Sequence, residues 1–192
     1  LNYKSYDLII GSTQKNISDS DSYETLYCDV LDKNSLFECT KSVDAVINLS
    51  GLNSEDSKKF PDLANDVKIL GNKNLSEACK LNNVKKIISF STIHVYKKPL
   101  IGEFLENSSA MPSHPYGISN LKGEKSLIDA LTNTDIDYTI FRLSNAVGRP
   151  LNVQNNCWRL LVNDICRSAV ADQSITIKSN KNTLRDFISI SD

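Results

Sequence analysis

Short apolar runs alternate along this chain with longer segments whose hydrophobic residues recur at helical spacing. The runs are continuous rather than alternating, which is typical of strands covered on both faces. Two helical patterns stand out, at 62–83 and 114–133, and the first carries an apolar face that we expect to be buried. The residues of that face are Leu63, Val67, Leu70, Leu75 and Ala78. The predicted strands are 6–12, 24–30, 44–50, 85–92, 137–144 and 174–179.

Strands that alternate with helices imply right-handed crossovers and a mostly parallel sheet. We therefore predict an α/β fold, a Rossmann-like doubly wound parallel sheet. Ligands of such sheets bind beyond the carboxyl ends of the strands, so the polar residues that follow each strand are the first candidates for function. These residues are Asp29, Asp32, Ser50, Gly51, Ser91, Thr92 and Asn145.

Composition narrows the class of protein. The 192 residues are 40% hydrophobic and 23% charged, with a net charge of −1, as in globular domains of ordinary size. No basic run favours nucleic acid as a partner, and no apolar run is long enough to span a bilayer. The five cysteines form no C-x-x-C pair and neither histidine is near one, so we expect no metal site but reduced thiols in a cytoplasmic protein.

Six segments in order then resemble one family. They are YCDVLD (27–32), VDAVINLSG (43–51), GNKNLSEACKLNNVKKIISFSTIHVY (71–96), HPYGISN (114–120), FRLSNAVGRP (141–150) and RDFISISD (185–192). Together they resemble the extended short-chain dehydrogenases/reductases, the NAD(P)-dependent sugar-nucleotide epimerase/dehydratase family. The resemblance implies a partial NAD(P)-binding domain over 1–150 and the beginning of a substrate-binding region over 151–192. It also implies a homodimer.

The resemblance assigns roles at the predicted site. Tyr116 matches the tyrosine that takes a hydroxyl proton while hydride passes from the sugar to nicotinamide, and Thr92 matches a residue that hydrogen-bonds substrate and tyrosine. Asn145 and Arg185 match positions that hold a nucleotide diphosphate, although an Arg185–Asp186 ion pair is an alternative. The residues that match cofactor contacts are Asp29, Val30, Leu49, Ser50, Gly51, Lys68 and Ser91.

The choice between NAD and NADP depends on the residues after the first predicted strand. An acidic residue there would hold the ribose 2′-hydroxyl of NAD, and none is present. Ser12 and Lys15 suit a 2′-phosphate, which favours NADP over NAD; the alternative is an ordinary polar turn.

The chain departs from the family pattern in three ways. It lacks the glycine-rich loop and ends at Asp192 before most of a substrate lobe, so we expect a fragment. Position 120 is Asn where the family has Lys, and Lys68 stands at the position of a cofactor-contacting Asn. Lys122 lies on another helix face, so Lys68 is the better candidate to restore a positive charge near Tyr116.

Three functional hypotheses follow. The first is a nucleotide-sugar epimerase, dehydratase or reductase with Tyr116 as base, Thr92 as its partner and Asn120 as a weaker neutral neighbour. The second is a non-catalytic NAD(P)-binding module that lost activity with the change at position 120. The third is a reductase of small carbonyl compounds, which would not need Arg185.

Overall fold

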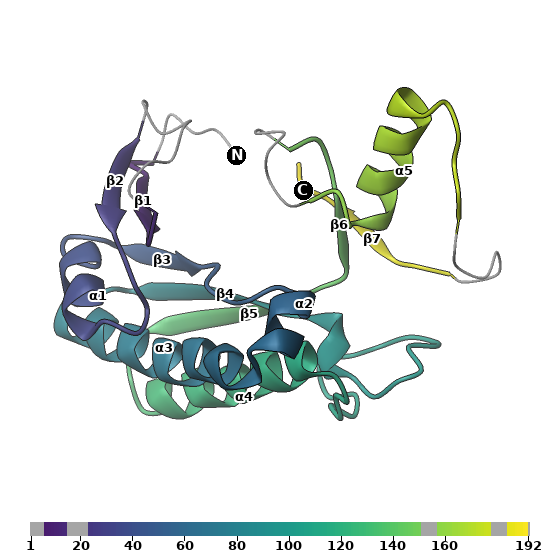
Figure 1. Ribbon diagram of the computed structural model, residues 1–192. Coiled ribbons are helices and arrows are strands. Elements are labelled where there is room, and N and C mark those ends of the chain that lie inside the picture. Colours follow the sequence, from purple (N-terminus) through teal and green to yellow (C-terminus); the bar gives the residue numbers. More distant parts are fainter. Residues whose placement is uncertain (1–5, 15–22, 151–156, 178–183, 192) are drawn as a thin grey trace. The chain divides into compact units, whose positions relative to one another are not determined.

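The computed structural model describes residues 6–14, 23–150, 157–177 and 184–191. They fall into two compact units, Leu1–Arg142 and Leu143–Asp192 (Figure 1). The first unit contains β1 (Ile9–Ser12), β2 (Glu24–Tyr27), α1 (Lys33–Cys39), β3 (Ala45–Asn48), α2 (Ser54–Lys59), α3 (Pro61–Leu81), β4 (Lys86–Thr92), the 3₁₀ helix η2 (Ile93–Val95), α4 (Pro115–Leu131) and β5 (Asp137–Leu143). Leu143, the last residue of β5, is the first residue of the second unit. The second unit contains β6 (Asn145–Val147), α5 (Leu161–Ala171) and β7 (Phe187–Ser189).

Parallel pairing confirms the predicted α/β class. β1 pairs with β2, β3 pairs with β4, and β6 pairs with β7, each in parallel, while β5 lies beside β4. Figure 1 shows α3 and α4 side by side along the β3–β4–β5 sheet. The register of β3 on β4 runs from Ala45 opposite Lys86 to Asn48 opposite Ser89, so the carboxyl ends of both strands reach the same edge.

One predicted strand is wrong, and several elements were not predicted. Residues 174–177 belong to no strand, and the rest of the predicted 174–179 segment lies outside the described residues. Ile175 and Ile177 are 52% and 59% exposed, so the apolar residues of this segment are not buried as those of a covered strand would be. Sequence periodicity missed α1, α2, α5, β6 and β7 because each is short.

The buried face of α3 differs from the predicted one. Leu63 and Leu70 are 44% and 47% exposed, whereas Ala64 and Cys79 are almost fully buried. Small and polar residues on α3 face α4, because the two helices approach closely at Gly123, where an added Cβ would come within 2.9 Å of the Lys68 Cβ. The apolar core gathers at the other end of α3. Its residues are Leu36, Leu75, Ala78, Cys79, Val84, Ile87, Leu127 and Leu131.

Within the described residues, none of the helices combines the length and the apolar character needed to cross a membrane.

Candidate functional site

The end of β4 meets the start of α4 at a threonine and a tyrosine. Thr92 is the last residue of β4 and is 5% exposed, and Tyr116 lies in the first turn of α4. Burial raises the pKa of Tyr116, and the nearby Thr92 side chain acts in the opposite direction. The ring of His94 lies edge-on to the Tyr116 ring, 6.2 Å away. The two residues predicted as base and partner are therefore in contact.

Local sequence fixes the start of α4 at this place. Pro115 suits the first helical position, since its missing N–H would have no partner there. His114 caps the helix, and its Nδ1 accepts a hydrogen bond from the Tyr116 backbone N–H at 3.2 Å. The sequence assigned no role to His114, whereas in the structure it orients the turn that carries Tyr116.

Gly117 allows α4 to approach the segment after β4. A Cβ at this position would clash with the backbone carbonyl of His94. We expect Gly117→Ala to push α4 away, to lower the free energy of unfolding by about 1–3 kcal/mol and to weaken the Thr92–Tyr116 contact. Urea unfolding of the intact protein measures the first effect. Gly102→Ala is a control for the loss of a glycine, because a Cβ there meets no atom within 4 Å, although its φ of +92° adds backbone strain. A stability equal to wild type in Gly117→Ala would contradict the close approach.

Asn120 lies one turn after Tyr116 and is 4% exposed. Its Nδ2 donates to the backbone carbonyl of Tyr116 at 2.8 Å. The amide is therefore directed to the helix backbone, and it brings no charge to the phenol. Lys122 is exposed, as the helix geometry predicted.

The segment after β3 lies beside the end of β4. Ser50 donates from its hydroxyl and its backbone N–H to Asn48 Oδ1, at 2.7 and 3.0 Å. Gly51 has a φ of +155°, and an added Cβ would come within 2.7 Å of Lys68 Cε. Lys68, from α3, donates to the Phe90 carbonyl at 3.2 Å. Leu49 is 71% exposed and leaves an apolar surface beside these groups.

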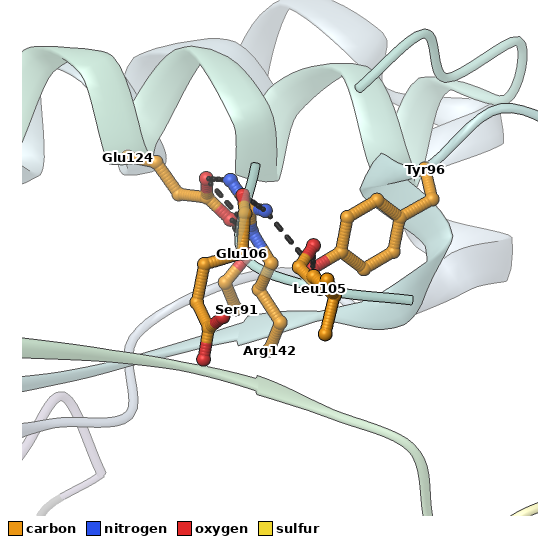
Figure 2. A network of polar contacts seen from close by, with 6 residues as sticks. All are labelled: Ser91, Tyr96, Leu105, Glu106, Glu124 and Arg142. Carbon is orange, nitrogen blue, oxygen red and sulfur yellow. Dashed lines mark hydrogen bonds and ion pairs between the residues drawn. The ribbon is translucent and has the colours of Figure 1, made fainter. Parts of the chain in front are cut away.

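Ser91 belongs to a polar network that sequence reasoning missed (Figure 2). Its hydroxyl donates to Glu124 Oε1 at 2.5 Å, and Arg142 binds both Glu124 oxygens, with the shortest contact at 2.6 Å. Arg142 also donates to the Tyr96 hydroxyl and to the Glu106 carbonyl, at 3.1 and 3.0 Å. The hydrogen bonds that Arg142 donates to Glu124 raise the pKa of Arg142. These contacts give Arg142 a structural role, and nothing in the sequence identified Glu124 as its partner.

The segment after β2 holds two of the predicted cofactor contacts, Asp29 and Val30. Asp29 Oδ1 accepts the Leu31 N–H at 2.9 Å, and the Asp29 backbone N–H donates to Ser35 Oγ at 3.0 Å. The side chain of Val30 packs closely against Gly71.

The turn after the first predicted strand is only partly covered by the described residues, which end at residue 14 before resuming at 23. Ser12 Oγ accepts the Gln14 backbone N–H at 3.0 Å, as in an ordinary polar turn. Lys15 lies outside the described residues.

The predicted substrate residues lie in the second unit. β6 and β7 pair with Asn145 opposite Phe187, and Asn145 Nδ2 donates to the Asp186 carbonyl at 2.9 Å. Arg185 precedes β7 and is exposed. The pairing of β6 with β7 thus brings together residues that are 42 positions apart in the sequence, such as Asn145 and Phe187.

The two surface pockets along α3 are not lined by the side chains of the candidate site. Two open hollows of about 540 and 530 Å³ lie along α3, one shared with the segment after β2 and the other with α4. Tyr116, Thr92 and Ser50 line neither. No group of three His, Cys, Asp or Glu side chains suited to a metal ion occurs in the described part of the chain. The candidate site is therefore defined by converging polar groups at the strand ends.

Comparison with known proteins gives one consistent result. The model of the NAD dependent epimerase/dehydratase family matches residues 1–192. A putative UDP-glucose 4-epimerase of Methanocaldococcus jannaschii is 27% identical over 154 residues, which cover 79% of this chain and 50% of that protein. The chain spans half or less of the length of the curated relatives it matches.

Solved structures share the fold. UDP-glucose 4-epimerase of Thermotoga maritima with UDP-glucose aligns with a TM-score of 0.84 at 18% identity, over 98% of this chain and 63% of that one. UDP-glucose 4-epimerase of Brucella ovis in complex with NAD aligns with a TM-score of 0.83 at 20% identity, over 97% and 62%.

Proposed function

Because the chain belongs to the NAD-dependent epimerase/dehydratase family, we propose that the protein is an NAD(P)-dependent epimerase, dehydratase or reductase of nucleotide sugars. The observation that carries this proposal is the proximity of the Thr92 and Tyr116 side chains at the carboxyl end of β4. A phenol paired with a hydroxyl, at the strand edge where α/β proteins bind ligands, suits the movement of a substrate proton.

The strand ends fit a dinucleotide. The hydroxyls of Ser50, Ser91 and Thr92 and the ammonium of Lys68 lie near the ends of two adjacent strands, and such groups bind ribose and phosphate oxygens. The exposed Leu49 side chain offers an apolar surface for an aromatic ring. When bound, NAD or NADP would accept hydride from a carbon of the sugar. The preference for NADP over NAD remains a prediction from the sequence, and so does the homodimer.

In the proposed mechanism, Tyr116 takes the proton of a sugar hydroxyl as that carbon loses hydride, and it returns the proton in the reverse step. Thr92 holds the phenol oxygen in place and donates to the phenolate, which lowers the pKa of Tyr116. Burial has the opposite effect on that pKa, so the site needs a positive charge to work near neutral pH.

The second unit supplies the proposed contacts to the nucleotide diphosphate. The Arg185 guanidinium is exposed and presents a planar fork that matches phosphate oxygens. Asn145 lies beside it through the pairing of β6 with β7.

The experiment uses the intact protein with NAD or NADP and a panel of UDP- and dTDP-sugars. Cofactor binding by calorimetry and product identity by mass spectrometry and NMR are the readouts. We expect binding of at least one cofactor and conversion of at least one nucleotide sugar. Failure to bind either cofactor would overturn the proposal.

The Asn120 amide donates to the Tyr116 backbone carbonyl and brings no charge to the phenol. This favours a second candidate function, a cofactor-binding module without catalysis. Asn120→Lys separates the two, because a lysine there adds a cation beside Tyr116. In a working enzyme we expect turnover to rise by about threefold to tenfold, measured by product formation. Asn120→Met is the control, since it matches the length of lysine without the charge. Cofactor binding with no turnover in wild type and in Asn120→Lys would support the module.

A further inference from the structure

A series of hydrogen bonds runs through the interior from α4 to the segment after β3. Asn72 on α3 donates from Nδ2 to the Gly123 carbonyl on α4, and Asn48 at the end of β3 donates from Nδ2 to Asn72 Oδ1, both at 2.8 Å. Ser50 donates to Asn48 Oδ1 from its hydroxyl and from its backbone N–H, at 2.7 and 3.0 Å. Asn48 and Asn72 are only 5% and 3% exposed. We call these four residues the amide relay.

Both ends of the amide relay fix the direction of its hydrogen bonds. The Gly123 carbonyl can only accept, so the Asn72 amide turns its Nδ2 to Gly123 and its Oδ1 to Asn48. At the other end, the Ser50 backbone N–H can only donate, so Asn48 presents its Oδ1 there. The two requirements agree. The Ser50 hydroxyl meets the same Oδ1 atom, which can only accept, so the hydroxyl proton points into the protein.

This direction decides what Ser50 offers to a ligand. A hydroxyl has one donor and two lone pairs, and the donor of Ser50 is bound to Asn48. Ser50 is half-buried and follows the carboxyl end of β3, so a ligand at this edge would meet its lone pairs. Lone pairs accept from hydroxyl and amide groups, whereas an ionised phosphate oxygen is itself only an acceptor. Ser50 therefore suits a donor group of a ligand and disfavours a phosphate.

The neighbouring strand repeats the arrangement. Ser50 and Ser91 each lie two residues after the last pair in the register of β3 with β4. The Ser91 hydroxyl donates to Glu124, whose carboxylate accepts from Arg142 through both oxygens. The hydroxyl protons at both strand ends thus point inward. Ser91 is only 9% exposed, so Ser50 is the more accessible of the two.

We propose that Asn48 and Asn72 are positioning residues that hold Ser50 as a hydrogen-bond acceptor for a donor group of the dinucleotide, a ribose hydroxyl or an amide or amino N–H. This inference rests on the proposed binding of NAD or NADP and narrows it, because Ser50 then contacts a donor-bearing part of the cofactor and not its phosphates. It also accounts for two buried amides bonded in series behind a strand end.

Calorimetric titrations of the intact protein with cofactor analogues test the role of Ser50. Each analogue of the dinucleotide that wild type binds lacks one donor: deoxy analogues lack one ribose hydroxyl each, the 3-acetylpyridine analogue lacks the carboxamide N–H, and the hypoxanthine analogue lacks the amino group. We expect one analogue to bind wild type about three- to tenfold more weakly than the parent cofactor, with a difference below about twofold in Ser50→Ala. Equal losses in both proteins for every analogue would overturn the inference.

Substitution of Asn72 tests the amide relay itself. Asn72→Leu keeps a similar volume but takes away the acceptor that fixes the direction of the Asn48 amide. We expect the affinity for the parent cofactor to fall about three- to tenfold, but less than about twofold when the substitution is added to Ser50→Ala. A purely structural role of Asn72 would give the same loss with and without the Ser50 hydroxyl, and that result would contradict the proposal.

Asn82→Ala is the matched control. Asn82 also sits on α3 and donates from Nδ2 to a backbone carbonyl, that of Phe37, at 2.8 Å. It caps the end of α3 that precedes the start of β4, at the opposite edge of the sheet from Ser50. Its loss should leave the cofactor affinity unchanged. A decrease equal to that of Asn72→Leu would contradict the amide relay.

Hydrogen exchange of the cofactor-free protein separates this inference from the proposed function. The Ser50 backbone N–H is bound to Asn48 Oδ1, so its exchange should become at least about fivefold faster in Asn72→Leu and stay as in wild type in Asn82→Ala. The same rate in folded Asn72→Leu as in wild type would overturn the amide relay. If Asn72→Leu does not fold, Asn72→Ala replaces it with the same expectations.

The two proposals can fail separately. If wild type bound a cofactor but no analogue distinguished it from Ser50→Ala, this inference alone would fail. If wild type bound neither NAD nor NADP, the proposed function and the cofactor contact of Ser50 would both fail, while the exchange rates would still decide whether Asn72 holds Ser50 in place.

Discussion

A Tyr116→Phe variant of the intact protein is expected to lose about 10²- to 10⁴-fold in kcat toward its nucleotide sugar, while it keeps its affinity for NAD(P). The phenol oxygen is the one atom removed, and it is the atom whose pKa the Thr92 side chain influences and which is proposed to take the proton. The ring remains, so its edge-on packing with His94 and the start of α4 should persist. Steady-state kinetics and calorimetry with the cofactor measure the two quantities.

Tyr138→Phe is the matched control, since Tyr138 is a partly exposed tyrosine on β5. It should retain full activity. A Tyr116→Phe protein with more than half of the wild-type kcat would show that another group moves the proton.

A Glu124→Gln variant is expected to lower the free energy of unfolding by about 3 kcal/mol. Removal of this carboxylate leaves the Arg142 guanidinium without its counter-charge, and the two side chains are only 5% and 22% exposed. The loss should also free the Ser91 hydroxyl and loosen the residues around Leu105 and Glu106, which meet in the same network (Figure 2). Urea unfolding of the intact protein gives the measurement.

The control is Glu77→Gln, which breaks an ion pair of similar length at the surface. Glu77 binds Lys33 at 2.7 Å, but the two side chains are 40% and 65% exposed. Such a pair contributes less than about 1 kcal/mol, because water screens it. Equal effects of the two substitutions would contradict the account of Glu124 as a buried partner of Arg142.

Local patterns in the sequence were enough to predict the elements that carry the candidate site. The apolar run before Thr92 and the helical spacing after His114 have physical causes within a few residues, namely strand burial and a capped helix start with Pro115. Because parallel strands end at one edge, the sequence also predicted that the segment after β3 would lie near Thr92.

Contacts between distant residues could not be predicted in the same way. Glu124 and Arg142 are 18 residues apart, on a helix and a strand, and no periodicity links them. The same holds for the buried face of α3: polar Lys68 and Asn72 occupy it because they reach Phe90 and Asn48, while Leu70 points outward.

Asn120 and the segment 174–177 show where residue type alone was not enough for a prediction. The sequence placed Asn120 beside Tyr116, but only the structure shows that its amide is directed to the Tyr116 carbonyl. At 174–177, a short apolar run predicted a strand, yet these residues have no strand partner, and Ile175 and Ile177 stay exposed. Strand pairing depends on residues far away in the sequence, and residue type does not fix the direction of a side-chain hydrogen bond.

The most direct test of Tyr116 as the base of a hydride-transfer site is a single-turnover experiment. Intact wild-type protein and Tyr116→Phe, each saturated with cofactor and mixed with the same nucleotide sugar, are followed at the absorbance of the reduced nicotinamide. The account predicts a rapid change in absorbance in wild type and, at equal cofactor occupancy, a change slowed by at least about 100-fold in Tyr116→Phe. The same rate in both proteins would contradict it.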